Sequence, residues 1–281
     1  MSFKEALNQL TERAEQAARE SGRAEHLGDD GLLHCDTCGE PTQCRVEIFD
    51  EIRTVRCICE CERKRQEALE QQRRQEEKER RIQRLRIRGF DKAEMQGWTF
   101  ENDDGKQPNL TRAAKAYCEQ FQKFKADGKG LVFYGNVGTG KTYAAACIAN
   151  ELISKGVPVL MTNFTRIINR LQDKFEGRQK YLDSLNNFDL LIIDDLAAER
   201  NTDYVNEAVY SVIDGRYRAG LPLIVTTNVS LKEMMNAAEI ARKRIYSRLL
   251  ERCHPIQVAG EDRRKQAALD DFAEMNRLLG L

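Results

Sequence analysis

Residues 130–142 read Gly-Leu-Val-Phe-Tyr-Gly-Asn-Val-Gly-Thr-Gly-Lys-Thr, an apolar run followed by a glycine-rich turn and the start of an alanine-rich helix. Gly135, Gly140, Lys141 and Thr142 match the pattern G-x-x-x-x-G-K-[ST] in the strand, loop and helix setting that gives the pattern meaning. Glycine is needed because the backbone must fold closely around an anion and point its N–H groups inward. The stretch therefore predicts a phosphate-binding site at the N-terminus of the following helix.

The residues of this loop have distinct expected roles. Lys141 is expected to reach the β and γ phosphates of a nucleoside triphosphate, and the Thr142 hydroxyl to bind Mg²⁺. The residues expected to contact the nucleotide are Gly135, Asn136, Val137, Gly138, Thr139, Gly140, Lys141, Thr142 and Tyr143.

Length and charge restrict the class of protein. The 281 residues are enough for one large or two ordinary domains. Because the formal net charge is zero, contact with nucleic acid would depend on local patches. With 32 % charged residues and no apolar run as long as a bilayer span, we expect a soluble protein without a membrane segment. The first residues lack the apolar core of a signal peptide, which predicts a cytoplasmic location.

The cysteines are unevenly placed, because six of the nine fall within residues 35–61. In a reducing compartment a metal explains such a cluster better than disulfides do. Cys35 and Cys38 have the C-x-x-C-G form of a zinc knuckle, and the alternating run over residues 46–56 predicts a hairpin that brings in a second group of thiols. Since nothing in this stretch places a catalytic water or a general base, we expect a structural Zn²⁺ that stabilises a module too small for its own core.

The second group of thiols is irregular, because its C-x-C-x-C spacing offers one more thiol than zinc requires. The predicted ligands are Cys35, Cys38, Cys57 and Cys59, with Cys61 as the main substitute and with Cys44 and His34 less favoured. Reduced cysteines without a metal and an iron–sulfur cluster are the alternatives.

Polar segments flank the cysteine cluster. Residues 1–30 predict a short amphipathic helix closed by a turn at 28–31. Residues 62–88 carry eleven Lys or Arg against six Glu, which predicts a solvated helical linker with i,i+4 ion pairs. The excess of positive charge keeps open a surface for DNA phosphates or an acidic partner. Trp98 and Phe100 then mark the entry to a second domain, where they pack either beside the nucleotide base or in an ordinary interdomain contact.

From Leu110 onward helical and strand patterns alternate, which favours a parallel sheet with crossover helices. The expected strands are 130–134, 157–162, 188–193, 222–227 and 255–258. The expected helices are 110–126, 141–155, 164–173, 178–186, 204–219, 231–235, 239–251 and 262–278.

Polar side chains follow two of these strands. Asp194 and Asp195 end the apolar run that starts at Phe188. A buried strand that ends at the phosphate site should place Asp194 on the Mg²⁺ shell, directly or through water, and leave Asp195 to orient the attacking water. Asn228 follows the next apolar strand and is expected to hydrogen-bond the γ phosphate or that water; a turn residue at a strand end is the alternative.

Taken together, residues 90–281 resemble the AAA+ ATPases of the DnaC/IstB group, which are bacterial and phage helicase loaders and transposition helpers. The motifs that carry the resemblance are Walker A at 135–142 and Walker B at Asp194 and Asp195. The zinc knuckle resembles the N-terminus of phage-type loaders of that group. The resemblance implies a sensor 1 residue at Asn228, an arginine finger at Arg248 and a sensor 2 arginine at Arg264, with Arg244 and Arg263 as competitors.

The implied fold class is α/β, an AAA+ P-loop parallel sheet flanked by helices. It would follow a zinc-binding, partner-binding module over residues 1–61 and a charged helical linker over 62–89, with the ATPase domain over 90–281. The resemblance also implies contacts with single-stranded DNA, in which Phe175 and Tyr204 stack on bases and Lys174, Arg178 and Lys180 pair with phosphates. The alternative is that both aromatic residues belong to the core.

The function implied is that of an ATP-dependent loader of a DnaB-like hexameric replicative helicase. In such a loader the zinc module would grip the helicase while ATP-bound subunits self-associate head to tail on DNA, and Arg248 of one subunit would complete the site of the next. The alternatives are an IstB-type transposition helper and a nucleotide-gated adaptor with negligible hydrolysis. The adaptor stays open because Asp195 stands where the longer Glu is common.

Overall fold

The structure, a computed structural model, describes residues 9, 13, 16, 22, 24–48, 50–173, 177–199 and 202–281, apart from the side chains of 264, 266–270 and 273. The chain divides into two compact units, Met1–Lys78 and Glu79–Leu281. This division falls within the helix α2 (Glu60–Gly89). The predicted boundaries of a zinc module, a linker and an ATPase domain stay a prediction. Among the described helices, none is both long enough and apolar enough to span a bilayer.

The first unit contains two antiparallel hairpins. Its strands are β1 (Glu25–Leu27), β2 (Leu33–Cys35), β3 (Gln43–Ile48) and β4 (Glu51–Arg56). β1 pairs with β2, and β3 pairs with β4. The second hairpin confirms the prediction over residues 46–56. Residues 25–27 form a strand, so the helix predicted over 1–30 is wrong at its C-terminal end. The turn predicted at 28–31 is present, because Gly31 N donates to Gly28 O at 3.0 Å. The remainder of that predicted helix lies almost wholly outside the described residues.

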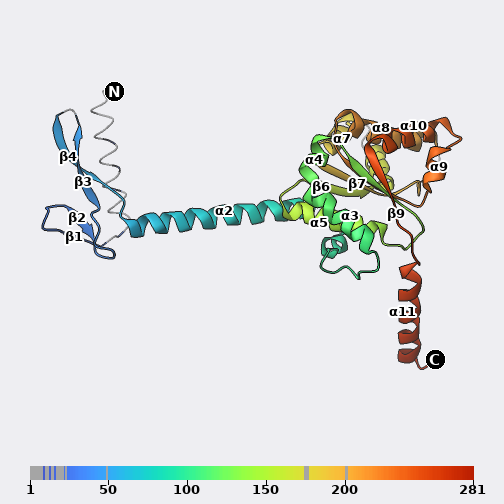
Figure 1. The fold of residues 1–281 in the computed structure, drawn as a ribbon, viewed down its shortest axis with the longest axis horizontal. Helices are drawn as coiled ribbons and strands as arrows, with labels where there is room; N and C mark the ends of the chain where they lie inside the picture. Colours follow the sequence, from blue (N-terminus) through green and yellow to red (C-terminus); the bar gives the residue numbers. More distant parts are fainter. Residues whose placement is uncertain are drawn as a thin grey trace. The chain divides into compact units, whose positions relative to one another are not determined.

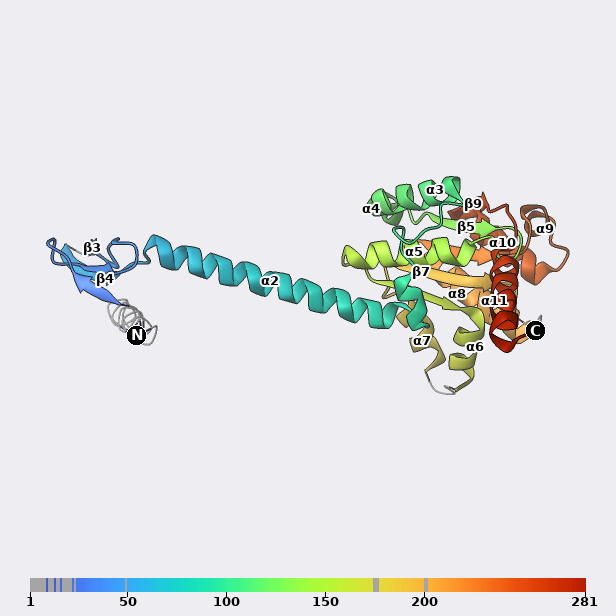
Figure 2. The same cartoon turned by 90° about the horizontal axis from the view of Figure 1, so that it is seen from below.

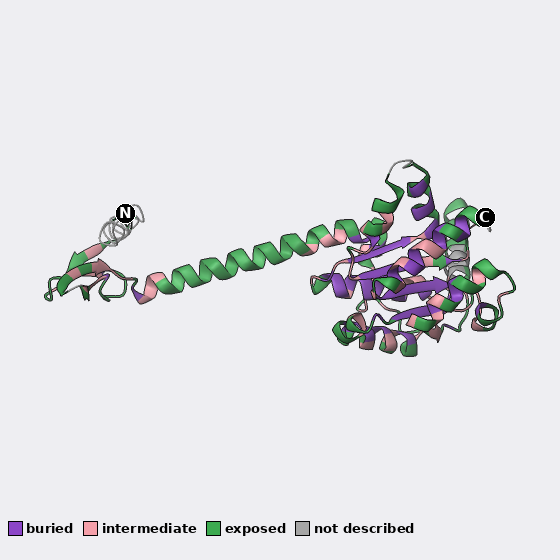
Figure 3. Ribbon diagram, turned by 90° about the horizontal axis from the view of Figure 1, so that it is seen from above, coloured by how far each residue is buried: buried purple, intermediate pink, exposed green. Residues whose placement is uncertain are grey.

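Helix α2 confirms the helix predicted over residues 62–88. The pairs Glu60 with Lys64 and Glu70 with Arg74 are four residues apart and lie at 2.7 and 2.6 Å. Exposed pairs of this kind contribute little to stability but keep such a helix well solvated. The middle of α2 is exposed throughout, as the green ribbon in Figure 3 shows.

The second unit is built on a five-stranded parallel sheet with the order β6-β7-β8-β5-β9. Figure 1 shows this sheet with helices around it. The strands are β5 (Gly130–Tyr134), β6 (Val159–Asn163), β7 (Leu190–Leu196), β8 (Leu223–Thr227) and β9 (Cys253–Gln257). Parallel strands need crossover connections, and their buried runs are apolar without alternation. The carboxyl ends of β5, β7 and β8 therefore lie side by side at one edge of the sheet.

Helices cover both faces of this sheet (Figure 2). They are η1 (Ala93–Gly97, a 3₁₀ helix), α3 (Pro108–Glu119), α4 (Phe121–Ala126), α5 (Lys141–Ser154), α6 (Phe164–Asp173), α7 (Arg178–Leu185), α8 (Asp203–Arg218), α9 (Leu231–Met235) and α10 (Ile240–Arg252). A further helix, α11 (Arg263–Leu279), runs away from the sheet (Figure 1). The core on one face uses residues of η1, α3, α4 and α5, and the core on the other face uses residues of α6 to α10. The predicted α/β class and parallel sheet are confirmed.

One predicted helix differs in the structure. The helix expected over residues 110–126 is interrupted at Gln120, whose φ is −99° and ψ 14°. The interruption lets two aromatic rings contact Tyr117, with centroid distances of 6.0 Å to Phe121 and 5.0 Å to Phe124. Burial of large aromatic side chains outweighs the continuity of one helix.

Candidate nucleotide site and cysteine cluster

The phosphate loop joins the buried strand β5 to helix α5. Gly140 precedes the first residue of α5 and has a left-handed φ of 99°. Gly135 has a φ of 143°, and a Cβ there would lie 2.2 Å from the carbonyl oxygen of Val258. A side chain at either position would strain or displace the backbone. The loop therefore has the glycines that its path requires.

Lys141 is held inside this loop. The residue is only 5 % exposed. Its Nζ donates to the carbonyl oxygens of Gly135 at 2.9 Å and Asn136 at 2.6 Å, and to Oδ1 of Asn228 at 2.9 Å. A buried ammonium needs such acceptors. The structure thus brings Asn228, at the end of β8, to the same point as the predicted phosphate-binding lysine.

Asp194 lies at the end of β7 and meets the start of α5. Its Oδ1 accepts hydrogen bonds from the hydroxyl of Thr142 at 2.8 Å and from that of Thr226 at 2.6 Å. These contacts put the two residues predicted to bind Mg²⁺ next to one another. Burial is the main cause that raises the pKa of the Asp194 carboxyl above its ordinary value, whereas the two hydroxyls act in the opposite direction.

Asp195 is the next residue along β7 and is exposed to solvent. It has a φ of 54°, in the left-handed region that non-glycine residues rarely adopt. Its backbone N–H donates to the hydroxyl of Thr226 at 2.9 Å. Thr226 therefore holds both acidic residues. The role of Thr226 was not predicted, because nothing local in the sequence indicates that its strand β8 lies beside β7.

A cavity of about 640 Å³ opens over these residues, a volume typical of small-molecule sites. Its lining residues are Lys92, Glu94, Met95, Trp98, Val137, Gly138, Thr139, Gly140, Lys141, Thr142, Tyr143, Asp194, Asp195, Asn228 and Arg263. Lys92 and Glu94 were not predicted to lie at this site, because they precede the phosphate loop by about forty residues. Trp98 lies in its wall, 5.7 Å from the ring of Tyr143, whereas Phe100 lines a smaller neighbouring hollow.

The predicted arginines divide into two groups. Arg263 is the first residue of α11 and lies at the phosphate loop. Its backbone N–H donates to Gly138 O at 3.1 Å, and its guanidinium pairs with Asp104 at 3.1 Å. The side chain of Arg264 lies outside the described part of the structure, so its role stays a prediction. Arg244 and Arg248 lie on α10 and do not line the cavity of their own chain among the residues that the structure describes.

The residues predicted to contact DNA are only partly described. Lys174 and Phe175 lie outside the described residues. Arg178 and Tyr204 are neighbours, with the guanidinium 5.7 Å from the ring centroid. Tyr204 is 36 % exposed and so is not a core aromatic. Contact between these residues and DNA stays a prediction.

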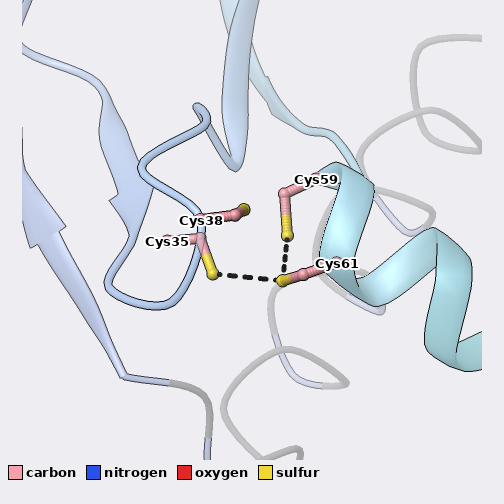
Figure 4. Close-up of side chains that lie close together, drawn as sticks. All are labelled: Cys35, Cys38, Cys59 and Cys61. Carbon is pink, nitrogen blue, oxygen red and sulfur yellow. Dashed lines mark hydrogen bonds between the residues drawn. The ribbon is translucent and has the colours of Figure 1, made fainter.

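Four thiols converge in the first unit, from Cys35, Cys38, Cys59 and Cys61 (Figure 4). All four Sγ atoms lie within 4.8 Å of one another. A tetrahedral Zn²⁺ with Zn–S bonds of about 2.3 Å needs Sγ atoms roughly 3.8 Å apart, so the group fits one such ion. Backbone N–H groups of Cys38 and Thr37 lower the pKa of Cys35 to about 6, which favours the thiolate that metals bind.

The structure contradicts one member of the predicted group of four thiols, whereas zinc binding itself stays a prediction. Cys57 does not belong to the group. Its thiol instead donates to the carbonyl oxygen of Pro41 at 3.3 Å. Helix α2 begins at Glu60, and its first turn brings the thiol of Cys61 to 3.3 Å from that of Cys59. The main substitute, Cys61, therefore takes the place of Cys57. His34 bonds Asp30 and Gly39 instead.

We expect the variant Asp194→Asn to have opposite effects on stability with and without nucleotide. Because the pKa of Asp194 is raised in the folded state, protonation favours folding, and this contribution is lost as pH rises through the raised pKa. At pH 7 the amide removes the burial cost of the charge, so the melting temperature without ligand should rise by roughly 2–4 °C. With ATP and Mg²⁺ the gain in melting temperature should be smaller than in the wild type.

Thermal melts with and without ATP and Mg²⁺ measure both effects, and the exposed Asp195→Asn serves as the matched control. That control should melt at the wild-type temperature without ligand. A lower melting temperature for Asp194→Asn without ligand would contradict the expectation.

A phosphate loop whose lysine and threonine meet a strand-end asparagine and aspartate on a five-stranded parallel sheet defines a P-loop nucleotide-binding protein of the AAA+ class. The chain belongs to the family of IstB-like ATP binding proteins, whose family model matches residues 60–270. The resemblance to the DnaC/IstB group is thereby confirmed.

Individual relatives agree with this family. The replicative helicase loader DnaC of Escherichia coli (strain K12) is 31 % identical over 179 residues, which cover 60 % of this chain and 69 % of the relative. The replicative helicase loader DnaI of Bacillus subtilis (strain 168) is 28 % identical over 187 residues, with 60 % and 58 % covered. A crystal structure of DnaI matches with a TM-score of 0.51 and 25 % identity, covering 64 % of this chain and 99 % of that one.

Proposed function

We propose that the chain is an ATP-dependent loader that places a DnaB-like hexameric replicative helicase on single-stranded DNA at replication initiation. The choice of helicase rests on the relative that is 31 % identical and named replicative helicase loader. The dependence on ATP is supported by the cavity in which Lys141, Thr142 and Asp194 lie together.

In the proposed mechanism ATP displaces the oxygens that now surround Lys141. The ammonium would exchange two loop carbonyls for the β and γ phosphates, while Asn228 stays within reach of the γ phosphate or the attacking water. Thr142 and Asp194 would hold Mg²⁺, which neutralises charge on the phosphates during transfer. Asp195, exposed at the strand end, would orient the attacking water.

Hydrolysis in this proposal depends on self-association. Arg248 lies on the surface of α10, away from the cavity of its own chain. An arginine supplied by a neighbouring subunit stabilises the spread negative charge of phosphoryl transfer, so that hydrolysis reports assembly. Hydrolysis would then weaken the subunit contacts and release the loader.

The remaining parts of the chain would choose the partners. The first unit, with Zn²⁺ bound by its four thiols as a structural ion, would grip the helicase. Tyr204 and Arg178, together with Phe175 and Lys174, would contact single-stranded DNA, because aromatic faces stack on bases of any sequence.

The proposal is tested by loading a replicative hexameric helicase onto circular single-stranded DNA coated with single-strand binding protein. We expect helicase on the circle only with this protein and ATP present, and none with Lys141→Ala. Lys155→Ala, which removes an exposed lysine from the end of the same helix, should load normally.

A second candidate is an IstB-type transposition helper, which the description of the matching family favours. Such a protein should copurify with a transposase and bend duplex DNA. If the full chain retains a transposase and no helicase, and changes the bend of a duplex but loads nothing, the loader proposal is wrong and the transposition helper is supported.

A further inference from the structure

Helix α8 buries an acidic residue that the nucleotide site does not use. The side chain of Asp214 is 5 % exposed. Its Oδ1 lies 3.4 Å from Nε of Arg248 and accepts a hydrogen bond of 3.4 Å from the hydroxyl of Tyr210, and its Oδ2 lies 2.5 Å from Arg218. A buried carboxylate persists when such partners surround it. One carboxylate is therefore shared by two guanidinium groups on different helices.

Arg248 is restrained from two directions by α8. Asp214 holds its Nε, and the ring of Tyr217 lies under its guanidinium, with 4.2 Å between the central carbon and the ring centroid. Ion pairing at the edge and stacking on the face together fix the plane of a side chain that is otherwise very flexible. The side chain of Arg248 is still 37 % exposed.

The restrained guanidinium faces an open groove. Arg248 lines a hollow of about 430 Å³ together with Tyr210, Ile240, Lys243, Arg244 and Ser247. A guanidinium has five N–H donors, and Asp214 approaches Arg248 on its Nε side, at 3.4 Å. The terminal nitrogens are therefore the part of Arg248 that is suited to a further anion, in a groove with two other cationic side chains.

Arg244, one turn earlier on α10, provides a contrast. Its guanidinium stacks on the ring of Tyr210 at 4.5 Å, and the residue is exposed. Among the described side chains no carboxylate lies in ion-pair range of Arg244. Both arginines that competed for the role of arginine finger therefore stack on a ring of α8, but Arg248 is the one that α8 also holds through a carboxylate.

We propose that Asp214 is a positioning residue that holds Arg248 in the orientation in which it reaches the nucleotide of a second copy. The inference rests on the proposed function, because it needs a nucleotide site completed between copies. A guanidinium that is already oriented loses less conformational freedom when copies assemble, so more of the contact energy is available in the transition state. Asp214 itself touches neither the nucleotide nor the water.

The test uses mixtures of two full-length variants. The acceptor carries Arg248→Ala and keeps its own nucleotide site, and the donor carries Lys141→Ala and keeps Arg248. Each alone should hydrolyse ATP poorly, and the mixture should hydrolyse ATP because the donor supplies Arg248. Adding Asp214→Asn to the donor should lower the rate of the mixture by roughly 10–100-fold, the scale expected for a catalytic group misplaced by about an ångström. Adding Asp214→Asn to the acceptor should leave the rate unchanged.

The position of the variant separates positioning from a general structural role. A variant that merely unfolds α8 should lower the rate in donor and acceptor alike, and this result, or no effect in either, would overturn the inference while the shared site stands. If the two parent variants never restore hydrolysis in a mixture, the proposed shared site itself is wrong, and the inference is wrong with it. Arg218→Ala in the donor removes the other, exposed cation of Asp214 and should retain the rate.

Discussion

ATP turnover by Lys141→Ala should fall by about 100-fold or more, the usual cost of removing a group that stabilises charge in a transition state. The ammonium of Lys141 is buried at the centre of the loop, and the oxygens that hold it belong to the loop and to Asn228. Alanine removes the only predicted cation of the loop itself. Hydrolysis measured with and without single-stranded DNA, together with ATP binding by calorimetry, would show the loss.

Lys155→Ala is the matched control for this prediction. Lys155 follows the last residue of α5, where it pairs with Glu151 at 2.9 Å on the surface, so its removal should leave turnover and binding unchanged. Turnover of Lys141→Ala near the wild-type rate would contradict the assigned site. Wild-type protein that binds ATP but hydrolyses none in a single turnover, even with single-stranded DNA, would instead favour the nucleotide-gated adaptor.

The nucleotide site was largely predictable, because its parts follow local rules. The glycines, Lys141 and Thr142 lie within one loop, and Asp194 lies at the end of an apolar strand. Parallel strands end at the same edge of a sheet, so the bond between Thr142 and Asp194 follows from two separate stretches. Thr226 was not predictable, because it became a partner of Asp194 only through the strand order, in which β8 lies between β7 and β5.

The placement of Arg263 and Arg248 also depends on contacts between residues far apart in the sequence. Arg263 and Arg264 are adjacent in sequence, and the pattern alone favoured the second. In the structure the backbone N–H of Arg263 donates a hydrogen bond to Gly138 O, and the residue lines the cavity. The buried partner of Arg248 could not be predicted either, because Asp214 precedes it by more than thirty residues and meets it only where α8 packs on α10.

For the cysteines, the cluster was predictable and its membership was not. The spacing C-x-x-C indicated Cys35 and Cys38, but C-x-C-x-C does not say where the hairpin ends and the helix begins. Since β4 ends at Arg56 and α2 begins at Glu60, Cys57 stays with the hairpin and Cys61 lies in the first helical turn. A shift of a few residues in that boundary decides which thiols can meet.

Replacement of Cys61 by serine should abolish stoichiometric zinc binding by the purified protein and unfold the first unit, whereas Cys57→Ser should retain both zinc and fold. Zinc binding by four thiolates supplies an apparent 10–16 kcal/mol at neutral pH, about as much as the whole stability of a small domain. Metal analysis of the full chain and limited proteolysis of residues 24–60 would measure the two effects.

The pair of variants is its own control, because each removes one thiol from the same short segment and each is a conservative change. A chelator should reproduce the effect of Cys61→Ser on the wild type and on Cys57→Ser, while ATP binding by the second unit continues, since the phosphate loop shares no residue with the cysteine cluster. If Cys57→Ser loses zinc and Cys61→Ser keeps it, the ligand set in the structure is wrong. If neither variant nor the wild type holds zinc after purification without chelators, the four thiols are reduced cysteines. The first unit would then have to bind the helicase through its hairpins without a metal.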